Sequence, residues 1–97
     1  MNMHNPLHPG KSIKKDYLEP LNLTTRELAN GLGVAKSTVD RLVKGQTGVT
    51  TDMAIRLGIC LSTTPESWLG MQRAYDVWKA QKENKKLYKS VKVIWKG

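Results

Sequence analysis

The segment from Lys36 to Lys44 carries the side chains of this chain that are best suited to bind nucleic acid. Apolar residues recur in it at Val39, Leu42 and Val43, so a helix there would bury one side and expose the other. The exposed residues are short, polar and mostly basic: Lys36, Ser37, Thr38, Asp40, Arg41 and Lys44. A helix that enters the major groove of DNA presents a face of this kind.

Side chains that could support catalysis or bind a metal are sparse. His4 and His8 are four residues apart, but Pro6 and Pro9 keep them from one regular helix, and we expect His8 to cap or pack against the first helix. The single cysteine, Cys60, has apolar neighbours and is interpreted as a small buried hydrophobic residue. The chain has no glycine-rich phosphate loop. The sequence therefore predicts no enzyme, no metal site and no cofactor.

The spacing of small and apolar residues over 25–44 predicts a helix-turn-helix. Two short helices that cross steeply need a small residue at the crossing and a left-handed residue at the turn. Ala29 and Gly33 meet these needs. The positions that face the shared core are apolar: Leu28, Leu32, Val34, Val39 and Leu42. A plain helical hairpin without function is the alternative, and the number of matching positions disfavours it.

Start and stop signals define the helices that precede and open this segment. A first helix is predicted over about 10–18, and Pro20 is expected to stop it. Thr24 and Glu27 fit a capping box that begins the second helix, and Gly33 ends it. The third helix is the segment described above.

Two further helices are predicted after it. Thr50 or Thr51 begins the fourth, whose apolar side is expected to consist of Ala54, Ile55, Leu57, Gly58 and Leu61. The fifth begins at Thr64-Pro65-Glu66, where a cap is followed by a proline and an acidic residue in the first turn. Large side chains at helical spacing form one stripe along this helix: Trp68, Met71, Tyr75 and Trp78.

The C-terminal end combines lysines with alternating apolar residues. Residues 79–97 hold seven lysines and one glutamate, a net charge of +6, whereas 1–78 hold nine basic and seven acidic side chains. This end could follow nucleic-acid phosphates, bind an acidic protein, or be a solvated terminus. The alternation of Val91, Val93 and Trp95 with other residues fits a short strand or a disordered tail.

Length and composition limit the architecture. Ninety-seven residues allow one domain. The sequence contains no run of about 18 apolar residues that could span a membrane, and its start does not resemble a secretory signal. We therefore predict an all-α protein of five helices, located in the cytoplasm, with its domain in 1–78 and a basic extension in 79–97.

Six strings of residues together carry a family resemblance. They are HPG at 8–10, LEPL at 18–21, the helix-turn-helix at 25–44, TTDMAIRL at 50–57, TPESWL at 64–69 and YD at 75–76. This combination resembles the HigA family, which are antitoxins of addiction modules with a helix-turn-helix of the phage-repressor type. The match covers about residues 8–78, outside the lysine-rich end. It implies the five-helix fold of lambda-repressor-like domains.

The resemblance also implies which residues touch DNA. In such repressors the early residues of the recognition helix reach base edges, and these are Lys36, Ser37 and Arg41 here. Either basic side chain could donate to guanine O6 and N7. Residues at the start of the preceding helix and after the recognition helix usually hold phosphates. These correspond to Thr25, Lys44, Gln46 and Thr47.

Two residues depart from the pattern of phage repressors. Thr25 stands where glutamine is frequent, so its contact to phosphate would be shorter. Ala35 replaces the usual Ser or Thr cap of the recognition helix, which removes a hydrogen bond that contributes about 1 kcal/mol.

The resemblance further implies partners. Family members dimerise on a palindromic operator ahead of their own operon, and they block a small toxin that cleaves mRNA. Met71, Tyr75 and Trp78 are candidates for the dimer or toxin contact, with the core side of a terminal helix as the alternative, favoured for Trp68. Two other functions stay open. One is a repressor without a toxin, and the other is a protein-binding module with a vestigial helix-turn-helix.

Overall fold

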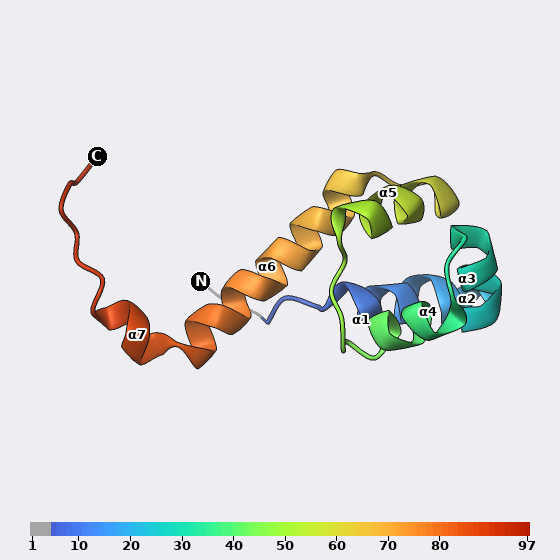
Figure 1. The fold of residues 1–97 in the computed structure, drawn as a ribbon, viewed down its shortest axis with the longest axis horizontal. Helices are drawn as coiled ribbons and strands as arrows, with labels where there is room; N and C mark the ends of the chain where they lie inside the picture. Colours follow the sequence, from blue (N-terminus) through green and yellow to red (C-terminus); the bar gives the residue numbers. More distant parts are fainter. Residues whose placement is uncertain (1–4) are drawn as a thin grey trace.

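The computed structural model describes residues 5–97, which form a bundle of helices that extends into one long helix (Figure 1). The molecule measures 50 × 25 × 22 Å, because the long helix carries the C-terminal end away from the bundle. His4, the other histidine considered with His8 as a metal or catalytic pair, lies outside the described residues.

Every regular element of residues 5–97 is a helix, which confirms the expected all-α fold. The elements are α1 (Pro9–Ile13), η1 (Lys14–Leu18), α2 (Glu19–Leu21), α3 (Thr25–Leu32), α4 (Lys36–Val43), α5 (Thr51–Cys60), α6 (Pro65–Glu83) and α7 (Lys85–Lys89). The first three follow one another directly and correspond to the first predicted helix, while α3 to α6 correspond to the other four. The short α7 lies within the lysine-rich end and was not predicted.

The prediction that Pro20 stops the first helix is wrong. Residues 14–18 form a π-helix, in which the Glu19 N–H donates to the carbonyl of Lys14. Pro20 lies in the first turn of α2, which continues the helix after this wider turn. At this position the missing N–H of proline leaves no backbone hydrogen bond unmade. The helix ends instead at Asn22, whose backbone is left-handed with φ 53°.

The predicted caps are present. Thr24 Oγ1 accepts from the Glu27 N–H at 3.0 Å, and Glu27 Oε1 accepts from the Thr24 N–H at 2.9 Å, which completes the capping box of α3. Thr50 and Thr64 cap α5 and α6 in the same way, through the N–H groups three residues on. Ala35 begins α4 without a side-chain cap, as expected. These caps fix where the functional helices begin.

The backbones of α1 and α4 approach each other closely at Gly10. Gly10 lies against the backbone of Leu42, and a Cβ atom added to Gly10 would overlap the Leu42 carbonyl oxygen. Ile13, Val39 and Leu42 are almost fully buried around this contact. α1 can therefore lie this close to the end of α4 only because residue 10 is a glycine.

The core consists of apolar residues of α1, η1, α3, α4 and α5, together with Val49 from the loop after α4 and Trp68 from α6. α5 packs on α3 and α6, and α1 packs on α4 and α6. Ile55 was expected on the apolar side of its helix, but it is 46% exposed. Ile59 is also mostly exposed. The inward side of α5 is formed by Met53, Ala54 and Leu57, because the helix contacts its neighbours over a narrower stripe than the sequence suggested.

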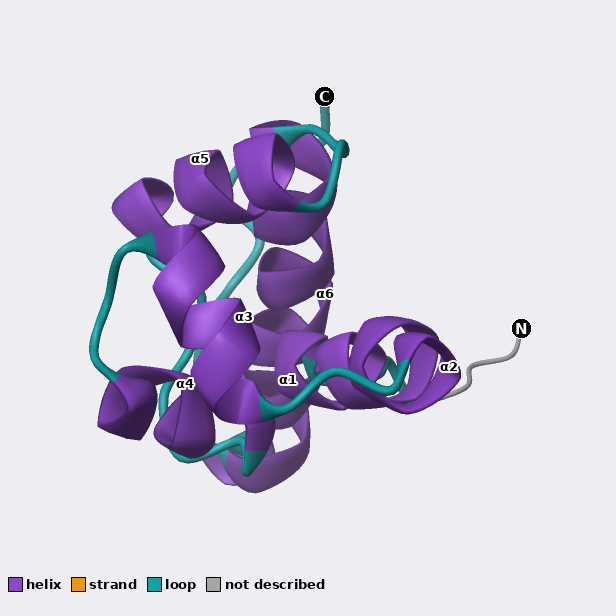
Figure 2. Cartoon of the chain, turned by 90° about the vertical axis from the view of Figure 1, so that its right-hand side faces the viewer, coloured by secondary structure: helices purple, strands orange, loops and turns teal. Residues whose placement is uncertain are grey.

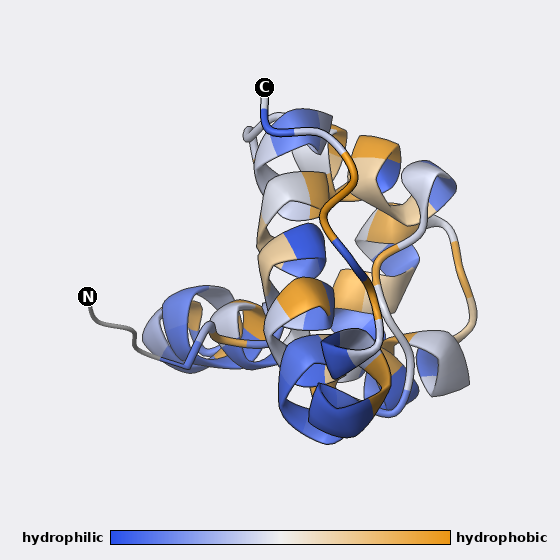
Figure 3. Ribbon diagram, turned by 90° about the vertical axis from the view of Figure 1, so that its left-hand side faces the viewer, coloured by the Kyte–Doolittle hydropathy of each residue, from blue (hydrophilic) through white to orange (hydrophobic). Residues whose placement is uncertain are grey.

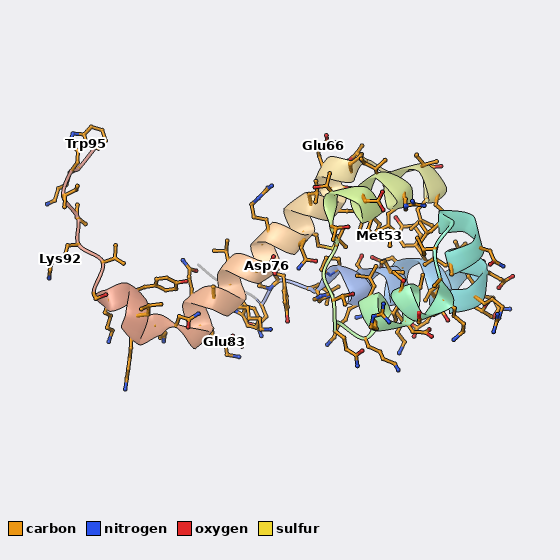
Figure 4. All side chains as sticks on the ribbon, viewed as in Figure 1. Met53, Glu66, Asp76, Glu83, Lys92 and Trp95 are labelled. Atoms are coloured by element: carbon orange, nitrogen blue, oxygen red, sulfur yellow. The ribbon has the colours of Figure 1, made fainter. Side chains whose placement is uncertain are left out.

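The C-terminal end lies far along the molecule from α4 (Figure 1). Residues 91–97 contain no strand, and the segment mixes hydrophilic and hydrophobic residues along its exposed length (Figure 3). Lys92 and Trp95 both project from this segment, at the opposite end from the bundle (Figure 4). Within residues 5–97, none of the helices combines the length and apolar character that crossing a membrane requires.

Candidate nucleic-acid interface

The turn between α3 and α4 is held in place by its own backbone and by α5. Gly33 is left-handed with φ 74°, and its N–H and that of Val34 donate to the carbonyl of Ala29 at 2.9 and 3.1 Å. Arg56 of α5 donates from Nη1 to the carbonyl of Leu32 at 2.8 Å. These bonds satisfy carbonyls at the end of α3 and fix the direction in which α4 leaves the turn.

α4 lies at the edge of the bundle beside α3 (Figure 2). Ser37 and Arg41 are exposed and four residues apart, so they share one face of the helix. Lys36 lies at the start of the same helix with 44% of its side chain exposed. The three residues predicted to contact bases are therefore all exposed on α4, with Ser37 and Arg41 on one face and Lys36 beside it.

The sequence placed Asp40 among the exposed residues of this helix without a partner, but in the structure it is half-buried and bonded to Lys36. Its Oδ2 accepts from Lys36 Nζ at 2.8 Å, and hydrogen bonds from Lys36 and from Thr25 hold the pKa of Asp40 below its usual value. Because Thr25 contributes to the lowered pKa, the Asp40 carboxylate faces the start of α3 as well as Lys36. The spacing of four residues between Lys36 and Asp40 was the available signal. Lys36 Nζ uses one of its three N–H donors in this ion pair, so the pair restrains the ammonium group while two donors stay available for a base.

The residues predicted to contact phosphates flank α4. Thr25 is half-buried at the first position of α3. Lys44, Gln46 and Thr47 are exposed where the chain leaves α4. Gly45 turns the chain at this point with φ 76°, a left-handed conformation that glycine adopts without strain.

The loop after α4 is fixed from the other side by α6. Gln72 Oε1 accepts from the backbone N–H of Val49 at 2.8 Å, and Gln72 Nε2 donates to Asp76 Oδ1 at 2.9 Å. A Cβ atom at Gly48 would lie 2.9 Å from Gln72 Nε2, so the backbone passes directly over this amide. The loop that carries the predicted phosphate contacts is thus attached to the long helix.

His8 closes the space between α1, this loop and α6. Its Nδ1 accepts from the Gly10 N–H at 2.9 Å, which confirms that it caps the first helix. Its ring meets the edge of Tyr75, with centroids 4.9 Å apart. Burial lowers the pKa of His8, and the nearby Asp76 carboxylate and the Thr47 backbone oppose that shift. In residues 5–97 no cluster of His, Cys, Asp and Glu side chains could hold a metal ion.

The residues predicted for a dimer or toxin contact lie along α6 and are half-buried: Met71, Tyr75 and Trp78. Trp68 is buried in the core, as the alternative interpretation held. Tyr75 and Trp78 are in contact with centroids 5.8 Å apart, and Lys82 Nζ lies 5.0 Å from the Trp78 ring centroid. This stripe faces the body of the protein over its first half and becomes more open towards Trp78.

A second side of α6 carries apolar surface that the sequence reasoning did not single out. A groove runs along it, lined by Gly70, Arg73, Ala74, Val77 and Trp78 among others. Val77 is 49% exposed in this groove. The spacing of Gly70, Ala74 and Val77 along one helical face was the signal available in the sequence.

Comparison with known proteins places these features in a family. The helix-turn-helix family model matches residues 14–68. The chain is 36% identical over 90 residues to Antitoxin HigA-1 of Vibrio cholerae, a match that covers 93% of this chain and 85% of that protein.

Solved structures give the same relationship. Antitoxin GraA in complex with its operator superposes with a TM-score of 0.89 at 36% identity, over 99% of this chain and 98% of that one. The Pseudomonas aeruginosa antitoxin HigA with the higBA promoter has a TM-score of 0.88 at 31% identity, over 93% of this chain and 99% of that one. The likeness therefore extends over the helix-turn-helix and the long helix together.

Proposed function

Because the chain belongs to the HigA family of helix-turn-helix antitoxins, we propose that it represses its own operon and serves as the antitoxin of a HigBA-like toxin–antitoxin module. Its named relatives are antitoxins, and two of them are described with operator or promoter DNA. Like them, this chain is a binding protein and not an enzyme. The proposal places it in the cytoplasm, where it would meet both its operator and the ribosome-associated mRNA that the toxin cleaves.

The observation that carries the proposal is the face of α4. Ser37 and Arg41 are exposed on it, and Lys36 lies beside them. The hydroxyl and the two basic groups can hydrogen-bond to base edges in the major groove, where each base pair presents a distinct pattern. We assign base contacts to these three residues.

We assign phosphate contacts to the residues that flank this face: Thr25, Lys44, Gln46 and Thr47. Contacts of this kind position the protein on DNA without reading its sequence. We place DNA recognition in the domain of 1–78 and treat 79–97 as a separate basic extension. The distance of the extension from α4 in one chain supports this division (Figure 1).

We propose that the functional unit is a homodimer on a palindromic operator. One recognition helix reads only a few base pairs, so tight binding needs two half-sites about 34 Å apart. The long helix α6 is the proposed contact for the second copy or for the toxin, through Met71, Tyr75 and Trp78. Half-buried aromatic residues of this type frequently anchor protein interfaces.

The test is binding of the purified protein to DNA from immediately upstream of its own gene, against a random duplex of equal length. Both are measured at a low and a near-physiological salt concentration. We expect a clear preference for the upstream DNA at the higher salt, because base contacts survive screening better than the non-specific charge attraction.

Other outcomes would replace the proposal. Equal and salt-sensitive binding to both duplexes would show that only the general basic charge binds DNA. Absence of binding to either duplex would favour the protein-binding module with a vestigial helix-turn-helix. Operator preference in a protein whose neighbouring genes encode no small ribonuclease would favour a repressor without a toxin.

A further inference from the structure

Three lysines on the first helix form a basic surface beside the recognition helix. Lys11, Lys14 and Lys15 are all exposed, and their spacing of three and four residues places them on one side of α1 and η1. The expected DNA-contacting residues do not include them. The proposed function therefore gives no role to the positive charges of these three lysines.

Their position relative to α4 is fixed by packing. Gly10 precedes Lys11 and lies against the backbone of Leu42, near the end of α4. Ile13, between Lys11 and Lys14, is fully buried. The lysines therefore cannot move away from the recognition helix without disrupting the core.

Two grooves connect these lysines to residues already proposed to hold phosphates. Lys44 at the end of α4 lines the first groove together with all three lysines and Glu19. Thr25 lines the second groove together with Lys14 and, again, Glu19. Lys14 therefore lies in the same groove as Lys44 on one side and in the same groove as Thr25 on the other.

The balance of charge at this surface is positive. The first groove has four lysines against the carboxylate of Glu19. The carboxylate of Asp16, on the same helix, accepts a hydrogen bond from Ser12 Oγ at 2.8 Å. Among the described residues the ion pairs are those of Lys36 and Arg56, so the three lysines have no ion-pair partner there.

On this basis we propose that Lys11, Lys14 and Lys15 bind the sugar–phosphate backbone of the operator and extend the interface beyond the helix-turn-helix. The inference rests on the proposed function, since it concerns the same DNA. It adds the first helix to the phosphate contacts already assigned to Lys44 and its neighbours, whereas the lysine-rich segment 79–97 lies far from α4 (Figure 1).

The experiment compares two variants that lose the same charge. In one, Lys11→Gln, Lys14→Gln and Lys15→Gln are combined, and in the other Lys85→Gln, Lys86→Gln and Lys89→Gln are combined on α7. Operator affinity is measured for both and for the unchanged protein between about 50 and about 200 mM salt. Circular dichroism and thermal unfolding check that both variants remain folded.

We expect the first variant to lose about 0.9 of salt slope for each phosphate-binding lysine, which is about 2.7 for each protomer and about 5.4 for the proposed dimer on its operator. Over this fourfold range of salt the operator affinity of the variant dimer should therefore fall about 1,800-fold less than that of the unchanged protein, or about 40-fold less for each half-site. The α7 variant should keep the full slope. Lysine-to-arginine changes at the same three positions of the first helix should retain it as well.

The possible results separate the inference from the function. An unchanged slope in the first variant, or an equal loss in both variants, would overturn the inference while operator preference still stood. A loss confined to the α7 variant would overturn it also and assign the contacts to the C-terminal end. If the unchanged protein does not prefer its operator, the proposed function itself fails.

Discussion

Single residues decide what α4 can recognise, and Arg41 has the clearest role. Its side chain is exposed, and no hydrogen bond or ion pair within residues 5–97 restrains it. Lys36 is different, because it is tied to Asp40 at 2.8 Å. The Arg41 side chain can therefore adopt the position that a guanine requires, whereas the position of Lys36 is restrained by its bond to Asp40.

Arg41→Ala should reduce operator specificity without unfolding the protein. A bidentate contact to guanine contributes about 1–3 kcal/mol of discrimination between base pairs, so the preference for the operator over a random duplex should fall by that amount. Competition binding at fixed salt measures this. Lys44→Ala is the matched control, since loss of a phosphate contact should weaken both duplexes alike. Loss of helicity in Arg41→Ala would contradict its outward position.

The sequence was sufficient to predict that Lys36, Ser37 and Arg41 are exposed, because helical spacing separates them from the buried residues. Thr38 and Asp40 were also expected to be exposed, but they are half-buried. The sequence was insufficient to show how Asp40 engages its neighbours. That interaction depends on where the first turn of α3 lies relative to α4, since Thr25 contributes to it. A contact between two helices depends on their crossing, which local patterns do not specify.

At the scale of elements, boundaries set by local chemistry were predicted well. Thr24, Thr50 and Thr64 each begin a helix, and Gly33 ends one, because caps and left-handed turns act within a few residues. The effect of Pro20 was not predicted. A π-helical turn before it changes which N–H groups need partners, and that turn has no clear sequence signature.

Gly10→Ala should destabilise the fold, because α1 approaches the Leu42 carbonyl too closely for a methyl group. Overpacking of this kind typically costs about 1–3 kcal/mol of unfolding free energy. Urea unfolding followed by circular dichroism measures the change.

Gly70→Ala provides the control for this prediction. Gly70 lies inside α6 with no atom within 4 Å of an added Cβ, so alanine there should raise stability by up to about 1 kcal/mol through helix propensity. Similar losses in both variants would show that glycine at position 10 is not specifically required by packing. A loss at Gly70 that depends on protein concentration would indicate that this side of α6 packs against a second copy.

For the molecule as a whole, His8 connects segments that are far apart in the sequence. It caps α1, contacts Tyr75 of α6, and lies 3.9 Å from where a Cβ of Gly45 would be. The bundle, the loop after α4 and the long helix therefore meet at one imidazole. The sequence predicted the capping role but not these tertiary contacts, since they require α6 to return to the start of the chain.

Stability should fall in mildly acidic solution because of this residue. Burial lowers the pKa of His8 below the ordinary value of 6.5, so below that pH the unfolded chain binds the proton more readily. The contribution is complete above pH 6.5 and is lost as pH falls towards the folded-state pKa. Urea unfolding at about pH 7.5 and about pH 5 should show the decline.

His8→Asn is the informative variant for this decline. Asparagine retains a cap acceptor but does not titrate, so its stability should depend less on pH over the same range. The charged groups that surround His8, namely Asp76, Lys79 and Lys11, are unchanged in it. An equally steep decline in the variant would assign the effect to other groups.

The side-chain amide of Gln72 has a consequence for how DNA and protein partners influence each other. It holds the loop after α4 through the N–H of Val49, and it lies on the helix proposed to meet a second copy or a toxin. Binding free energies at two coupled sites are reciprocal. A partner that shifts Gln72 would therefore change the affinity of the protein for its operator, and the operator would change the affinity for that partner by the same factor. The occupancy of the promoter would then depend on how much partner is present.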